Sequence, residues 1–222
     1  MTGARMSQRA SKSDSDNGDA SHKPSQNAGS RLEQAFSLTL SDLYEANAAV
    51  QICNALIHKH ENLAAEPVEH QQVWGFIDQA VSWKLAMALE RLTQRADKDR
   101  ASLAGLLREI RAAKKNGRKL HDERRLTGAE EGLIEALDQE ICKKLRVSRN
   151  AFMGHSLLGT DRVGVPLYDL IEFLGILEAI ADDLHHAVFG ETPPLDDHIE
   201  RWQELAFGWF DWAFPPRGQG DD

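Results

Sequence analysis

The fold is decided by a stretch near the C-terminus, LYDLIEFLGILEAIADDLHHAVF (residues 167–189). Its apolar residues recur at steps of three and four, which is the period of one face of an α-helix. Pro193 and Pro194 follow and separate this helix from a shorter aromatic one, IERWQELAFGWFDWAF (residues 199–214). Prolines disfavour continuation of a helix, so we expect two helices here and not one.

The same period governs the rest of the chain. Four earlier segments show it, at about residues 36–57, 73–92, 101–115 and 129–145, and Pro67 ends the first. No run of alternating polar and apolar residues reaches strand length, and no internal repeat is visible. The sequence therefore predicts an all-α fold, a bundle of about five to six helices.

Two details of these helices can be predicted. The segment 73–92 has one apolar line through Leu85 and Leu89 and a second through Phe76 and Met87, so we expect a helix buried on two sides. The segment 101–115 ends in lysines and is followed by Gly117, which is typical of a helix C-cap.

The two ends of the chain have little to bury. Residues 1–30 are mostly Ser, Asp, Asn, Gly and Lys, a composition that predicts a disordered arm. We therefore expect a bundle over residues 31–190, a C-terminal aromatic helix over 191–214 packed on it, and a tail over 215–222.

Composition excludes several classes of protein. The 222 residues are 27% charged and 41% hydrophobic, as in ordinary globular domains. The net charge of −9 argues against bulk electrostatic binding of nucleic acid but leaves room for a local basic site. Two isolated cysteines, no signal-like N-terminus and no bilayer-length apolar run predict a cytoplasmic protein without membrane contact, in which Cys53 and Cys142 are core residues.

One stretch combines functional side chains with an apolar face: KKLRVSRNAFMGHS (residues 143–156). If the helix continues from Ile141 at about 100° per residue, Ser148 and His155 lie close to its apolar stripe and Arg149 lies at the edge. Burying such groups without partners is costly. We therefore expect them to face either buried acids or an interface.

Arg149, Asn150, four further residues and His155 resemble the Arg-Asn-x(4)-His signature of HEPN domains, in the branch named after phage abortive-infection proteins. The resemblance extends over the flanking helices, at about residues 32–190. It implies a homodimeric endoribonuclease that needs no metal and no cofactor. By this resemblance His155 is the general acid–base group, Arg149 binds the scissile phosphate and Asn150 orients either of them.

These residue types suit RNA cleavage. RNA supplies its own nucleophile, the 2′-hydroxyl, so the protein has to move protons near neutral pH and stabilise negative charge. Two alternatives remain open for the motif. One is a catalytically silent dimer that acts as an antitoxin-like or partner-binding module, with a nucleotidyltransferase as a possible partner. The other is a helical scaffold in which Arg149 and His155 only hold helices together.

Further basic residues can guide RNA to this motif. The interpretation as RNA-binding residues covers Lys143, Lys144, Arg146, Lys114, Lys115, Arg118 and Lys119. A solvated loop is the more common explanation for the last four. Asp182 and His186 have a spacing that can bind metal, but no third ligand is indicated, so we predict no metal site. The tryptophans of the last helix are expected to pack on the bundle, with base stacking as the alternative.

Overall fold

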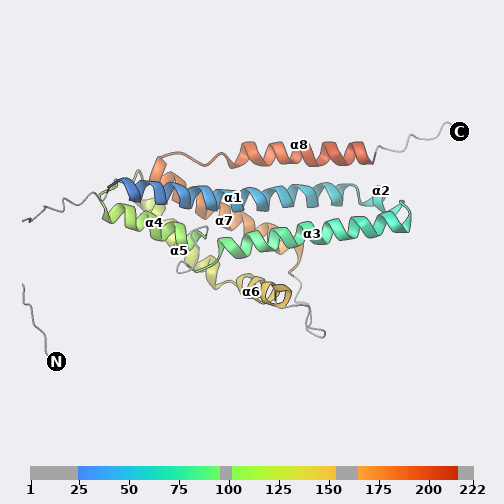
Figure 1. The fold of residues 1–222 in the computed structure, drawn as a ribbon, viewed down its shortest axis with the longest axis horizontal. Helices are drawn as coiled ribbons and strands as arrows, with labels where there is room; N and C mark the ends of the chain where they lie inside the picture. Colours follow the sequence, from blue (N-terminus) through green and yellow to red (C-terminus); the bar gives the residue numbers. More distant parts are fainter. Residues whose placement is uncertain (1–24, 96–101, 154–164, 215–222) are drawn as a thin grey trace, which may run out of the picture.

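The computed structural model describes residues 25–95, 102–153 and 165–214 (Figure 1). Within these ranges every regular element is a helix, which confirms the all-α prediction. The described helices are α1 (Ser25–His58), α2 (His60–Ala64), α3 (Val68–Leu92), α4 (Leu103–Lys115), α5 (Glu123–Asp138), α6 (Glu140–Met153), α7 (Leu167–Phe189) and α8 (Leu195–Ala213).

The long helix α1 is the centre of the bundle. It contacts α3 along its C-terminal part, α8 on another side, and α4 and α7 towards its N-terminal end (Figure 1). The α7 helix packs mainly against α5. Leucines of α1, α3, α4 and α7 are fully buried between these helices, among them Leu43, Leu85 and Leu177.

Local signals explain several helix ends. The α4 helix begins where the Ser102 hydroxyl accepts a hydrogen bond from the amide of Gly105 at 3.0 Å. It ends at Lys115 and is followed by Gly117, whose φ of 91° is accessible to glycine at little cost. The amides of Gly117 and Arg118 donate back to carbonyls of the last turn of α4, the paired bonds of a Schellman motif. The C-cap prediction for Gly117 is thus confirmed.

Helix α3 is buried only in part. Leu85 and Leu89 belong to the main core, but Val73 is exposed and Phe76 is 71% exposed. The prediction of a helix buried on two sides is wrong for the first half of α3, because this half extends beyond the elements that cover the second half (Figure 1). A small aromatic core, separate from the main one, joins this half to α8 through Phe210 and Phe214.

The chain ends fit the prediction less closely. Helix α1 begins at Ser25, six residues before the expected start of the bundle, because adding polar turns to an existing helix costs little. Residues 1–24 and 215–222 lie outside the described part. Helix α8 packs on α1, and its Phe214 is buried, but Trp212 is 78% exposed and does not pack on the bundle as expected. Cys53 and Cys142 are both buried, as predicted.

Candidate functional site

The motif begins on α6, which is a helix of its own. The prediction of one helix over residues 129–145 is wrong, because α5 ends at Asp138 and Gln139 has an extended backbone (φ −63°, ψ 148°). The thiol of Cys142 donates across this break to the carbonyl of Ala136 at 3.3 Å. The sequence offers no proline or glycine at this point that could have indicated the break.

The break changes which face of the motif helix is buried. Helix α6 contacts α3, α5 and α7, and Cys142 and Leu145 are its buried anchors. Ile141, which we expected on a continuous apolar stripe with α5, is only half-buried. Ser148 and Arg149 are half-buried as well, so the polar side of α6 lies at the edge of the packed face.

Arg149 forms an ion pair with a buried acid. Its Nη1 atom lies 2.6 Å from Oε1 of Glu90, which stands in the last turn of α3. The Glu90 side chain is 3% exposed and that of Arg149 is 36% exposed. Of the two surroundings expected for Arg149, the structure shows the first, a buried carboxylate.

Both carboxylate oxygens of Glu90 accept hydrogen bonds. Its Oε2 atom accepts a hydrogen bond of 2.9 Å from Nε2 of Gln94, while Oε1 receives Arg149. A buried carboxylate with two such donors is fixed in place, and it fixes the guanidinium in turn. We did not single out Glu90 from the sequence. The sequence does contain a signal for its burial: Glu90 is three positions after Met87, so it lies on the apolar line through Phe76 and Met87.

The other two motif residues lie at or beyond the end of α6. Asn150 follows Arg149 in the last turn, and its side chain is outside the described part of the structure. His155 lies two residues past Met153, also outside the described residues. The structure therefore places Arg149 and the backbone of Asn150.

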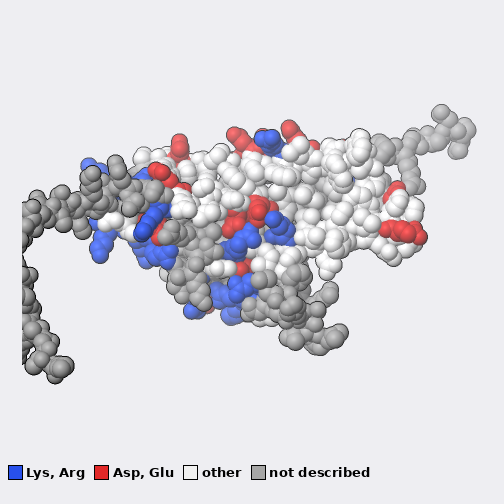
Figure 2. Space-filling view, in the orientation of Figure 1, with Lys and Arg blue, Asp and Glu red and all other residues white. Residues whose placement is uncertain are grey.

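The basic residues before the motif lie on the same helix. Lys143 is exposed and lies 3.1 Å from a carboxylate oxygen of Glu140, one turn back on α6. Lys144 and Arg146 are half-buried. Figure 2 shows blue side chains gathered over α6 on the face in view.

The second basic group lies at the end of α4 and in the loop after it. Lys114 lies 2.8 Å from a carboxylate oxygen of Glu123, and the guanidinium of Arg118 lies 5.5 Å from the centre of the Phe189 ring. Lys115 and Lys119 are exposed. This group and that of α6 are on separate helices, which share α5 and α7 as neighbours.

Asp182, which has a spacing to His186 that can bind metal, forms an ion pair instead. Asp182 lies 3.4 Å from Nη1 of Arg125, which also approaches Asp183 at 3.1 Å. Among the described residues, no group of three His, Cys, Asp or Glu side chains is arranged to hold a metal ion. Nor does any described helix have the length and apolar character that a membrane span requires.

The described helices form an all-α bundle, and comparison with protein families identifies the class to which it belongs. The chain belongs to the HEPN family: residues 30–206 match the family model HEPN_AbiU2, described as AbiU2. The match runs through the motif and into α8. Comparisons with curated proteins and with solved structures found no match.

Proposed function

We propose that this protein is a metal-independent endoribonuclease that works as a homodimer, with His155 as the general acid–base group and Arg149 as the phosphate ligand. Membership of the HEPN family and the abortive-infection type of its domain support the proposal. The observation that carries it is the fixed, partly exposed guanidinium of Arg149 at the end of α6.

The fixed guanidinium suits the chemistry. When the 2′-hydroxyl attacks the adjacent phosphorus, negative charge grows on the phosphate oxygens. A preorganised cation stabilises that charge without rearranging during the reaction. Glu90 supplies this preorganisation, because its buried carboxylate holds the guanidinium of Arg149.

His155 is proposed to carry out the proton transfers of the reaction. An imidazole can remove the proton from the 2′-hydroxyl and return it to the leaving 5′-oxygen near neutral pH. Asn150 is proposed to orient Arg149 or His155. Lys143, Lys144 and Arg146 are proposed to guide RNA to the motif from the same helix, with Lys114, Lys115, Arg118 and Lys119 as an extension of the track. We expect the enzyme to act in the cytoplasm.

A homodimer completes the proposed site. Arg149 and His155 are six positions apart, about 120° around the axis of an unbroken helix, so one chain points them in different directions. A two-fold axis that brings two copies of α6 together lets Arg149 of one subunit act with His155 of the other.

One observation favours a second candidate function. The ion pair of Arg149 with Glu90 also serves to hold α6 on α3. In a catalytically silent dimer this structural role is sufficient, and the protein acts by binding a partner such as a nucleotidyltransferase.

The experiment is RNA cleavage by the purified full-length chain in excess EDTA, with His155→Ala as the comparison. We expect the wild-type protein to cut a single-stranded test RNA and to leave 2′,3′-cyclic phosphate ends, and the variant to be inactive. Activity that disappears with EDTA and returns with magnesium would overturn the acid–base assignment. Binding of RNA without cleavage would favour the silent dimer.

A further inference from the structure

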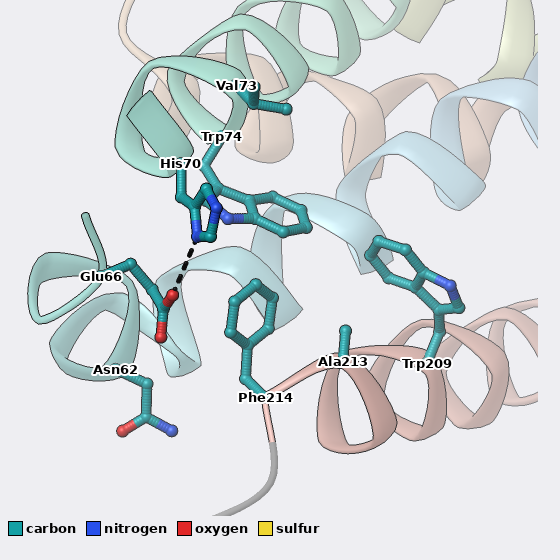
Figure 3. A pocket seen from close by; sticks show the side chains of 8 residues that line it. All are labelled: Asn62, Glu66, His70, Val73, Trp74, Trp209, Ala213 and Phe214. Carbon is teal, nitrogen blue, oxygen red and sulfur yellow. Dashed lines mark hydrogen bonds and ion pairs between the residues drawn. The ribbon is translucent and has the colours of Figure 1, made fainter. Parts of the chain in front are cut away.

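The end of the molecule opposite α4 carries a pocket that the proposed ribonuclease does not use. We call this end the tip and define it as residues 57–79 and 202–214, which cover α2, the first half of α3 and most of α8. The tip pocket has a volume of about 540 Å³. Its lining residues are Asn62, Glu66, His70, Val73, Trp74, Trp209, Ala213 and Phe214 (Figure 3).

Aromatic rings form much of the wall of the tip pocket. The ring of Trp74 lies 4.7 Å from that of Phe214 and 5.8 Å from that of Trp209, centre to centre, both edge to face. Trp209 is 48% exposed although it belongs to this cluster. Figure 3 shows the three rings around the hollow. Aromatic faces attract cations, most strongly when the ring is tryptophan.

A carboxylate stands on the opposite wall. Glu66 projects from the turn between α2 and α3 and is 3.1 Å from Nδ1 of His70 (Figure 3). Its surroundings are acidic, since the tip contains six carboxylates and a single lysine. That lysine, Lys59, is in an ion pair with Asp211. Figure 2 shows red but no blue side chains at the tip on the face in view.

Several large apolar side chains of the tip are exposed. Val68, Val73 and Phe76 on α3 and Trp212 on α8 are all more than half exposed. An apolar surface rimmed by charged groups is typical of a protein–protein contact. A second copy of this chain is disfavoured as the occupant, because a two-fold interface would bring the acidic rim against itself.

We propose that the tip binds a basic segment of another protein, with an arginine or lysine side chain in the tip pocket and apolar side chains on Phe76 and Trp212. The cation lies against the rings of Trp74 and Trp209 and is neutralised by Glu66. Charge complementarity decides the occupant: the acidic rim attracts a basic peptide and repels RNA, which the proposed active site binds at the other end of the molecule.

The test is calorimetric titration of the full-length protein with a short synthetic peptide of arginines and leucines. Matched peptides carry glutamine or glutamate in place of arginine. We expect the arginine peptide to bind at least about tenfold more tightly than the glutamine peptide and the glutamate peptide not to bind. Equal binding of all three, or no binding of the arginine peptide, would overturn the proposal.

Two pairs of variants separate the tip pocket from general attraction to an acidic protein. Trp209→Ala removes a pocket wall and is expected to weaken binding at least about tenfold, whereas Leu205→Ala, at an exposed α8 residue that does not line the pocket, is expected to weaken it less than about threefold. Glu66→Gln should weaken binding more than Glu69→Gln, whose side chain does not line the pocket. Equal losses within both pairs would show that the pocket is not the site. RNA cleavage should be unchanged in all four variants.

Discussion

In residues 102–153, which form α4, α5 and α6 and which we call the motif end, the twelve basic side chains outnumber the eight acidic ones, whereas the tip has one lysine for six carboxylates. Figure 2 shows the same separation on the face in view. The net charge of −9 hides this difference. An average over the chain therefore says little about which ligand either end attracts, because the attraction depends on local charge.

The two ends also depart from the usual pattern of burial in opposite ways. The motif end buries a carboxylate, Glu90, under an arginine. The tip exposes large apolar residues such as Phe76 and Trp212. Buried charge and exposed apolar surface both cost stability unless a partner compensates them. At the motif end the partner is within the chain, and at the tip we propose that it is another protein.

The largest effect that should distinguish the two ends is loss of cleavage. We expect His155→Ala to lower the rate of RNA cleavage at least about a hundredfold, the usual scale for removing a general acid–base group. Single-turnover rates measure this. A tip variant, Trp209→Ala, is the matched control and should keep the wild-type rate. A His155→Ala protein with unaltered activity would contradict the assignment.

Arg149 needs a more careful substitution. Arg149→Ala would leave Glu90 buried without its cation, which typically costs about 3–5 kcal/mol, so that loss of activity could reflect unfolding. Arg149→Lys keeps the positive charge beside Glu90 but loses the planar fork that grips phosphate. We expect Arg149→Lys to fold normally and to cleave at least about a hundredfold more slowly. Wild-type activity of a folded Arg149→Lys protein would leave Arg149 a structural role only.

Subunit mixing tests whether the motif end is shared between chains. Arg149→Lys and His155→Ala proteins, each inactive alone, should regain activity when they are unfolded and refolded together. A mixed dimer keeps one intact pair, Arg149 of one subunit and His155 of the other, so statistical mixing predicts about a quarter of the wild-type rate. No recovery in proven mixed dimers would mean that the site lies within one chain.

A smaller effect is expected at Glu90. Glu90→Gln keeps an oxygen that can accept from Arg149 but removes the charge that holds it. We expect cleavage to slow about tenfold while RNA binding changes little, because the guanidinium is less well aimed. Glu45→Gln is a matched control, since Glu45 also pairs with an arginine, Arg91, on the neighbouring face of α3. Equal losses in the two variants would indicate a general effect on α3.

Most of the fold could be predicted from apolar periodicity, including the cap at Gly117. The break at Gln139 could not, because it follows from how α5 packs on α7 and α6 on α3, and no local residue demands it. The exposure of Phe76 could not either, because a periodic pattern shows which residues share a face but not whether another element covers that face.

At the motif end, the sequence predicted which residues are functional but not which residues contact them. Arg149 stood out in the sequence because a cation beside an apolar stripe needs a partner. Glu90 is fifty-nine residues away in the chain and lies in an ordinary helical pattern, so the pairing emerges only from tertiary packing. The tip pocket combines Glu66 with Trp209 across a still longer separation and carries no motif.

The smallest effect concerns the core between the two ends. Glu178 on α7 accepts a hydrogen bond of 2.5 Å from Nδ2 of Asn47 on α1. Burial raises the pKa of the Glu178 carboxyl, the bond from Asn47 opposes this rise, and the charge of Asp196 on α8 adds to it. Because the pKa of Glu178 in the folded state lies above that in the unfolded chain, its contribution to stability is most favourable at low pH and is lost as the pH rises through the folded pKa.

Glu178→Gln removes this titration but keeps an oxygen for Asn47. We therefore expect the variant to match the wild-type protein in unfolding free energy near pH 4 and to become the more stable of the two as the pH rises to 7. Urea denaturation across this range measures the difference. A gain that does not grow with pH would show that Glu178 is not a carboxyl destabilised by burial. Since Glu178 belongs to neither end, cleavage by the motif and peptide binding at the tip should both remain unchanged.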